Sequence, residues 1–171
     1  PLSPDFYPWQ MVTYMFMHGG FTHLLFNMFA LVVFGSALES VWGEKRFLIY
    51  YMVCGIGSFF LYEFTVGLNI YSQIDSFDPG VDMGWVLGAS GSVFGLLLGF
   101  GMLFPNTKLM LLFPPIPIKA KYFVMGYGAI ELMTAFQNNP GDNVAHFAHL
   151  GGMLIGYIMI KHWQRDRTNF Y

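Results

Sequence analysis

Five polar residues interrupt the apolar stretches of this chain, and their types are suited to nucleophilic catalysis. They are His23, Asn27, Ser90, His146 and His149. A serine hydroxyl is a weak nucleophile at neutral pH and needs a base, such as an imidazole, within hydrogen-bond reach. Ser90 paired with His149 would supply that combination. Polar groups inside apolar segments are energetically costly, and for that reason they are functional candidates.

His23 and Asn27 are four residues apart, so they share one face of a helix. Both side chains can donate hydrogen bonds to an oxygen that becomes negative in a transition state. With the backbone N–H of Ser90 they would form an oxyanion hole. The alternative is that the pair only joins neighbouring helices by hydrogen bonds, as polar residues in membranes often do.

Small residues surround Ser90. The run Gly88-Ala89-Ser90-Gly91 places a hydroxyl at the start of a helix with little bulk beside it, and a helix N-terminus adds backbone donors. The run is not a G-x-S-x-G elbow, because Ser92 stands where the second glycine would be. The alternative is a small-residue stripe that serves helix packing alone. That stripe would consist of Gly84, Gly88, Gly91, Gly95 and Gly99.

Two glutamates, Glu63 and Glu131, also lie within apolar runs, each toward one end of its run. We expect a structural hydrogen bond, or a carboxylate that reaches the membrane surface, for each of them. No carboxylate is then left to orient an imidazole. The sequence therefore predicts a dyad of Ser90 and His149 rather than a triad.

A metal or ion site is a second interpretation of the histidines. His146 and His149 are three residues apart and share a helix face, and His18 and His23 could join them. This interpretation is the weaker one, because no carboxylate or cysteine within a span accompanies the histidines and there is no H-E-x-x-H motif. We expect no metal and no cofactor.

The composition indicates what kind of element must hold these residues. Charged residues make up 11% of the 171-residue chain, where soluble proteins carry about 25%. Aromatic residues at 19% and twelve methionines fit a surface that meets lipid. A net charge of -2 argues against a nucleic-acid partner. Cys54, the single cysteine, excludes an internal disulfide and is expected to be a small buried apolar residue.

Five apolar runs are long enough to cross about 30 Å of hydrocarbon. We expect spans at residues 22–40, 47–68, 85–104, 118–136 and 144–161. Backbone polar groups in lipid must be satisfied internally, and the runs are too long for barrel strands, so the spans are predicted to be helices. The predicted fold is an all-α polytopic membrane protein with a single domain over residues 1–171.

The basic residues predict the orientation. All eight fall on one side of the predicted topology, and the opposite segments, 1–21, 69–84 and 137–143, hold only acidic charges; the basic residues are Lys45, Arg46, Lys108, Lys119, Lys121, Lys161, Arg165 and Arg167. The positive-inside rule assigns the basic loops to the cytoplasm. The first, third and fifth spans then begin outside, so the five polar residues lie within about 10 Å of depth of one another. The site is expected to open toward the extracytoplasmic side.

Three motifs, in order, resemble the rhomboid family. They read His23-Leu24-Leu25-Phe26-Asn27, Gly88-Ala89-Ser90-Gly91, and Ala148-His149 followed by Gly152 and Gly156. The resemblance covers nearly the whole chain. It implies a helical-bundle intramembrane serine protease that cuts transmembrane or juxtamembrane segments of other membrane proteins within the bilayer. It also implies that Ser90 attacks the scissile carbonyl while His149 accepts its proton.

The same resemblance assigns supporting residues. Phe94 matches a position where the family often stacks an aromatic ring on the catalytic histidine, and Gly88, Gly91 and His146 are expected to support the site. Residues 7–21 resemble the family's first loop, in which Gln10 stands where many members have arginine. The family core has six spans, so we expect its first helix to precede residue 1. A rhomboid-like protein that binds transmembrane helices without cutting them is the alternative, but such relatives lack the nucleophile or the base.

Overall fold

The computed structural model describes residues 6–74, 87–111, 115–137 and 145–166, and helices make up most of it. The first elements of the described part are two short helices, α1 (Gln10–Thr13) and η1 (Tyr14–Phe16). The longer helical elements are α2 (Phe21–Ala30), η2 (Leu31–Gly35), α3 (Ser36–Trp42), α4 (Glu44–Ile74), α5 (Ser90–Leu103), α6 (Ala120–Gln137) and α7 (His146–Asp166). The elements α2, η2 and α3 follow one another without a break.

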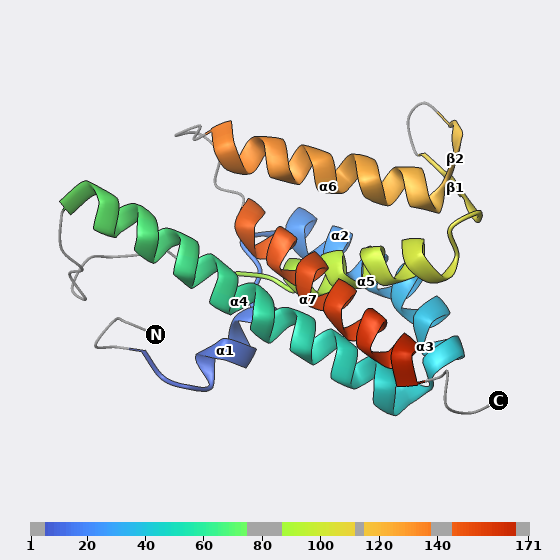
Figure 1. Ribbon diagram of the computed structural model, residues 1–171, viewed down its shortest axis with the longest axis horizontal. Coiled ribbons are helices and arrows are strands. Elements are labelled where there is room, and N and C mark those ends of the chain that lie inside the picture. The colour runs from blue at the N-terminus through green and yellow to red at the C-terminus, as the bar shows by residue number, and fades with distance from the viewer. Residues whose placement is uncertain (1–5, 75–86, 112–114, 138–144, 167–171) are drawn as a thin grey trace.

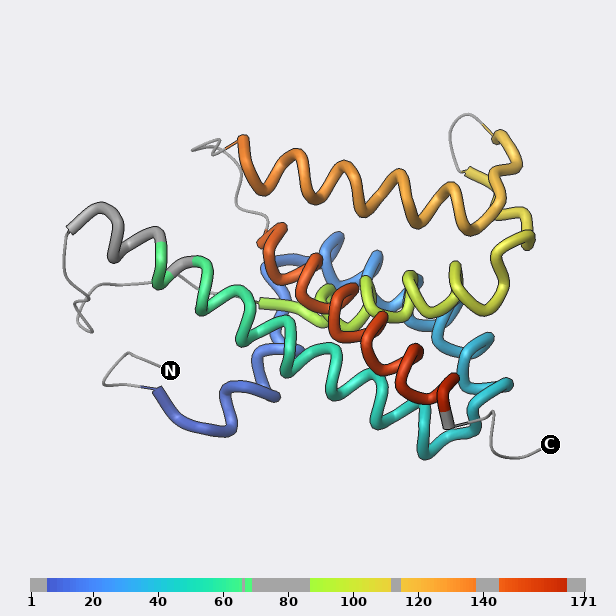
Figure 2. The backbone as a smooth tube through the Cα atoms, viewed as in Figure 1, coloured from blue at the N-terminus to red at the C-terminus, as the bar shows by residue number. Residues whose placement is uncertain are grey.

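The helices alternate in direction, which brings particular helix ends together. In Figures 1 and 2, α2, α5 and α7 begin near the end of the molecule at which α4 and α6 finish. The sharp reversal between α3 and α4 occurs at Gly43, whose φ of 76° lies in the left-handed region that favours glycine. The polar residues near the starts of α2, α5 and α7 are therefore delivered to one end of the bundle.

A small β-hairpin connects α5 to α6 at the opposite end (Figure 1). Strand β1 (Lys108–Met110) pairs antiparallel with β2 (Pro117–Lys119), and Leu109 faces Ile118 in the register. The fourth span was expected at roughly residues 118–136; residues 117–119 pair with β1, and α6 begins at Ala120. The hairpin is the part of this otherwise helical fold that apolar run lengths could not reveal.

Helix α5 is the central helix. It packs against α2, η2, α4, α6 and α7, and most of its side chains are buried. One part of the core lies between α5 and its neighbours and contains Leu38, Tyr50, Cys54, Leu96 and Ile160. Cys54 is fully buried, which confirms its predicted role as a small apolar core residue.

Within the described residues, two helical segments are long and apolar enough to cross a membrane, Phe21–Trp42 and Glu44–Thr65. Helix α5 has 14 residues, which at 1.5 Å per residue is about 21 Å and shorter than the hydrocarbon core. The third span was predicted at residues 85–104, but residues 87–89 are not helical, and residues 85 and 86 lie outside the described part of the chain. The count of five spans stays a prediction.

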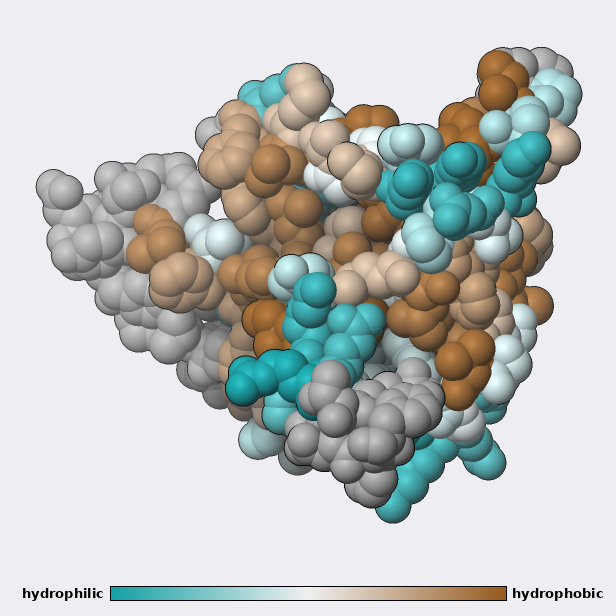
Figure 3. Space-filling model, turned by 45° about the vertical axis from the view of Figure 1, so that its right-hand side comes forward, coloured by the Kyte–Doolittle hydropathy of each residue, from teal (hydrophilic) through white to brown (hydrophobic). Residues whose placement is uncertain are grey.

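The exterior of the bundle is rich in exposed apolar side chains. Figure 3 shows apolar side chains over much of one face, with hydrophilic groups gathered in separate patches. Large apolar residues with more than half of their surface exposed include Phe26, Phe64, Met125, Met133 and Leu154. Water-soluble proteins rarely expose so much contiguous apolar surface, so this exterior is suited to lipid contact.

Candidate active site

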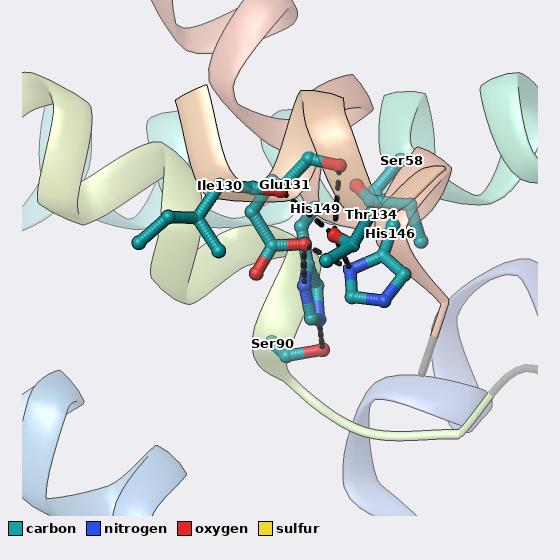
Figure 4. Close-up of polar contacts among 8 residues, drawn as sticks. Ser58, Ser90, Ile130, Glu131, Thr134, His146 and His149 are labelled. Carbon is teal, nitrogen blue, oxygen red and sulfur yellow. Dashed lines mark hydrogen bonds and ion pairs between the residues drawn. The ribbon is translucent and has the colours of Figure 1, made fainter. Parts of the chain in front are cut away.

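Ser90 and His149 meet at the end of the bundle where α5 and α7 begin. The Oγ atom of Ser90 lies 2.8 Å from Nε2 of His149, which is hydrogen-bond distance (Figure 4). Ser90 is the first residue of α5 and is partly buried, and the His149 ring in the first turn of α7 is buried. A hydroxyl and an imidazole in this contact have the geometry of a nucleophile and its general base.

The two residues meet because α5 and α7 approach each other without side chains between their backbones. A Cβ atom added at Gly152 would collide with the carbonyl oxygen of Gly91, and one added at Gly91 would collide with the side chain of Ser58. Ser58, on α4, donates a hydrogen bond of 2.6 Å to the carbonyl oxygen of Ala148, the residue before His149. Three helices thus fix the position of the His149 backbone.

Gly88 forms the turn immediately before Ser90 and lies beside the His23 ring. Its φ of 112° is strained for any residue with a side chain. A Cβ atom there would also lie 2.8 Å from both Cε1 and Nε2 of the His23 ring. Glycine at this position therefore allows the turn that starts α5 and leaves space for the His23 ring next to it.

The segment before α2 packs against the turn at Gly88. The Gly88 N–H donates to the carbonyl oxygen of Tyr14 over 3.0 Å, and the Tyr14 hydroxyl donates to the carbonyl oxygen of Gly55 on α4 over 2.7 Å. Burial raises the pKa of Tyr14 to about 12. Within the same segment, Gln10 accepts a hydrogen bond from the N–H of Tyr7. Gln10, which stands where the rhomboid family often has arginine, thus forms a local hydrogen bond within this segment.

Phe94 packs against the His149 ring. The two rings are stacked, with centroids 4.2 Å apart and an angle of 11° between their planes. Phe94 lies one turn after Ser90 on α5, so the helix that carries the hydroxyl also supports the imidazole face. The stack limits rotation of the imidazole about its side-chain bonds.

His23 and Asn27 lie on α2, which contacts α5. Asn27 is buried, and its Nδ2 donates to the carbonyl oxygen of His23 over 2.8 Å. An amide group has two N–H donors, so this bond uses one of them. The Nδ1 atom of His23 accepts a hydrogen bond of 3.4 Å from the N–H of Gly19, and its Nε2 edge faces Gly88. The His23 ring therefore lies beside Gly88, which is two residues before Ser90 in the sequence.

Glu131 makes a contact with the site that the sequence did not predict. Its Oε2 lies 3.0 Å from Nδ1 of His149 and 2.6 Å from Nδ1 of His146, and its side chain is mostly buried (Figure 4). The expectation that no carboxylate contacts the imidazole was wrong, because α6 packs against α7 and turns Glu131 inward. The available signal was its position toward the same end of the bundle as His149.

The same three residues have the spacing of metal ligands. One ligand atom from each of Glu131, His146 and His149 lies within 4.8 Å of the other two. A carboxylate thus joins two of the histidines, contrary to the expectation from the sequence that none would. His18 and His23, the other two candidates, have rings 5.2 Å apart in an edge-on contact with each other. Hydrogen bonds also explain the geometry of Glu131, His146 and His149. The Nδ1 atoms of the two histidines both contact Oε2 of Glu131, and each can donate an N–H to that oxygen.

Comparison with known proteins agrees with the motifs. A family model described as the Rhomboid domain matches residues 5–163. YdcA of Bacillus subtilis (strain 168) is 29% identical over 160 residues, which cover 92% of this chain and 70% of YdcA. The rhomboid protease AarA of Providencia stuartii is 28% identical, over 90% of this chain and 57% of AarA.

A plant relative is somewhat more similar in sequence. RHOMBOID-like protein 5 of Arabidopsis thaliana is 34% identical, over 94% of this chain and 47% of that protein. The chain thus spans about half the length of two of these three relatives. Because the family model covers nearly all of the chain, the chain belongs to the rhomboid family.

Proposed function

We propose that this protein is an intramembrane serine endopeptidase that cleaves transmembrane or juxtamembrane segments of other membrane proteins. The observation that carries the proposal is the hydrogen bond of 2.8 Å between Ser90 Oγ and His149 Nε2, within a member of the rhomboid family. The relative AarA, which is named a rhomboid protease, supports the reaction class.

In the proposed reaction, Ser90 attacks the carbonyl carbon of the scissile peptide bond. The Oγ–H bond breaks as the Oγ–C bond forms, the proton passes to Nε2 of His149, and the carbonyl π electrons move to the oxygen. Collapse of this tetrahedral species breaks the C–N bond, and His149 delivers the proton to the leaving nitrogen. A water molecule then attacks the Ser90 ester as His149 takes its proton, and collapse of the second tetrahedral species breaks the Oγ–C bond. His149 returns the proton to Ser90 Oγ, and the carboxylic acid product is released.

His23, Asn27 and the backbone N–H of Ser90 are proposed to stabilise the oxyanion. The His23 ring faces Gly88, beside Ser90, and Asn27 keeps one N–H beyond the bond to the His23 carbonyl oxygen. Hydrogen-bond donors fixed before the reaction stabilise developing charge most strongly where water is excluded. The helix N-terminus at Ser90 adds a favourable dipole.

The membrane determines the class of substrate. The apolar exterior of the bundle is suited to lipid, so a polypeptide that reaches Ser90 from the bilayer is itself a membrane segment. The distribution of basic residues supports a site that opens on the extracytoplasmic side, with the basic loops in the cytoplasm. We propose five spans in this chain. The first is the continuous run of α2, η2 and α3, and the others are α4, α5, α6 and α7.

Cleavage of a single-span membrane protein in proteoliposomes tests the proposal. The wild-type protein is expected to produce two fragments, and Ser90→Ala is expected to produce none while it binds the same substrate. Equal fragmentation by both proteins would contradict a serine mechanism. Substrate binding without cleavage by the wild-type protein would instead favour the rhomboid-like binder that recognises transmembrane helices.

A further inference from the structure

Glu131 on α6 reaches across to α7 and contacts two histidines with one carboxylate oxygen. Oε2 lies 3.0 Å from His149 Nδ1 and 2.6 Å from His146 Nδ1. Figure 4 shows Ser90, His149 and Glu131 in one line, with the imidazole between the hydroxyl and the carboxylate. The opposite nitrogen of the same imidazole is 2.8 Å from Ser90 Oγ.

An ionised carboxylate can only accept hydrogen bonds, so the histidine atom that contacts it must carry a proton. That requirement places the proton of a neutral His149 ring on Nδ1 and leaves a lone pair on Nε2. Nε2 is the atom that faces the Ser90 hydroxyl and must accept its proton. When the imidazole becomes cationic, the adjacent negative charge stabilises it.

We propose that Glu131 is a positioning residue for the proteolysis proposed above, on which this inference rests: it holds His149 in the Nδ1–H tautomer and stabilises the imidazolium. The dyad predicted from the sequence is thereby extended to Ser90, His149 and Glu131. Glu131 acts through His149 and does not touch the substrate.

His146 makes this placement of a carboxylate feasible. A buried charge is costly unless hydrogen bonds compensate its desolvation. The second N–H donor, from His146 Nδ1, supplies such compensation on the same oxygen, and Thr134 on α6 lies 3.1 Å from His146 Nδ1. His146 therefore anchors the carboxylate, while His149 is the residue that the carboxylate orients.

The alternative role for Glu131 is a simple tether between α6 and α7. A tether would stabilise the fold but would have no effect on which nitrogen of His149 carries the proton. Glu131→Gln separates the two roles, because the amide is nearly the same size yet can donate to Nδ1 and favour the Nε2–H tautomer. Glu131→Asp keeps an acceptor-only carboxylate and serves as the conservative variant.

The first measurement is kcat and KM for cleavage of the single-span substrate at neutral pH. For Glu131→Gln we expect kcat to fall by about 10²–10⁴-fold with KM nearly unchanged. Glu131→Asp is expected to retain more of kcat than Glu131→Gln. Glu39→Gln, an identical chemical change at an exposed position on α3 at the other end of the bundle, is the matched control and is expected to keep the wild-type kcat.

The second measurement is the ¹⁵N NMR spectrum of the histidine rings in detergent micelles. The wild-type protein is expected to show His149 protonated at Nδ1, and Glu131→Gln is expected to shift the proton to Nε2. This readout on the wild-type protein does not depend on the folding of any variant. A wild-type His149 with its proton on Nε2 would overturn the inference.

The outcomes separate this inference from the protease proposal. If the wild-type protein and Ser90→Ala cleave equally, the protease proposal fails. If only the wild-type protein cleaves but Glu131→Gln matches its kcat and tautomer, the positioning role fails and the protease proposal stands. Loss of wild-type activity on treatment with a chelator, restored by Zn²⁺ alone, would also overturn the positioning role in favour of metal ligation by Glu131, His146 and His149.

Discussion

At the scale of single residues, the His149 side chain is constrained on every side that matters for proton transfer. Nε2 contacts Ser90, Nδ1 contacts Glu131, and Phe94 stacks on the ring face. A half turn of the ring about its Cβ–Cγ bond would break both polar contacts. The pairing of Ser90 with His149 could be anticipated from motif order and depth. The Glu131 contact could not, because it depends on the rotation of α6 about its axis, which the sequence does not encode locally.

The proposed oxyanion donors predict a graded response to mutation. Asn27→Ala removes one of several donors, so we expect kcat/KM to fall by about 10²–10³-fold. His149→Ala removes the only proposed base and is expected to reduce cleavage to the level of Ser90→Ala. Rates of cleavage in proteoliposomes measure both effects. A larger loss for Asn27→Ala than for His149→Ala would contradict these roles.

At the scale of elements, glycines determine how closely α5 can approach its neighbours. The sequence offered two interpretations of the glycines near Ser90, a packing stripe and a catalytic motif, and the structure shows that packing and site geometry depend on the same residues. Gly91 and Gly152 allow the α5–α7 contact, and that contact brings Ser90 to His149. The helices themselves were largely predictable from apolar run length. The run Gly88-Ala89-Ser90-Gly91 correctly predicted a helix start at Ser90, although the apolar run that defined the span began at residue 85.

Gly152→Ala is predicted to destabilise the protein. Its methyl group would collide with the backbone oxygen of Gly91, which cannot move without separating α5 from α7. We expect a loss of about 1–3 kcal/mol in the free energy of unfolding. Gly126→Ala is the control, since a Cβ atom on that α6 residue meets nothing within 4 Å. Unfolding in denaturing detergent that ranks the two variants equally would refute close packing at Gly152.

Gly88→Ala is predicted to impair catalysis even if the protein folds. A side chain at a φ of 112° costs about 1–3 kcal/mol of backbone strain, and the new methyl group would displace the His23 ring. Gly20→Ala provides the comparison, because its φ of 165° is extended backbone and a Cβ atom there has open space. Cleavage assays and circular dichroism on both variants check the prediction. Wild-type kcat in Gly88→Ala would show that the turn is not needed for the site.

At the scale of the whole molecule, the alternating direction of the helices explains why the site residues lie close together. Alternation puts the starts of α2, α5 and α7 at one end of the bundle, as the topology of apolar runs predicted (Figure 2). The basic residues predict which end faces the cytoplasm, and that orientation stays a prediction. The short hairpin between α5 and α6 escaped prediction, because three-residue strands leave no periodic signal.

The orientation predicts which introduced cysteines a membrane-impermeant maleimide can reach in intact cells. Met17→Cys, exposed before α2 on the site side, should react, whereas Lys108→Cys in β1 should react only after the cells are lysed. Cys54 is fully buried, so the unmodified protein gives the background level. The reverse labelling pattern would place the basic loops outside and overturn the proposed orientation.

The most direct test of the bundle as a serine protease is the site at which a fluorophosphonate reacts. Mass spectrometry of the labelled wild-type protein in liposomes should find the adduct on Ser90 rather than on Ser58 or Ser92. The reaction rate should fall to background in His149→Ala. An adduct on another serine, or an equal rate of Ser90 labelling without His149, would contradict a nucleophile activated by that imidazole.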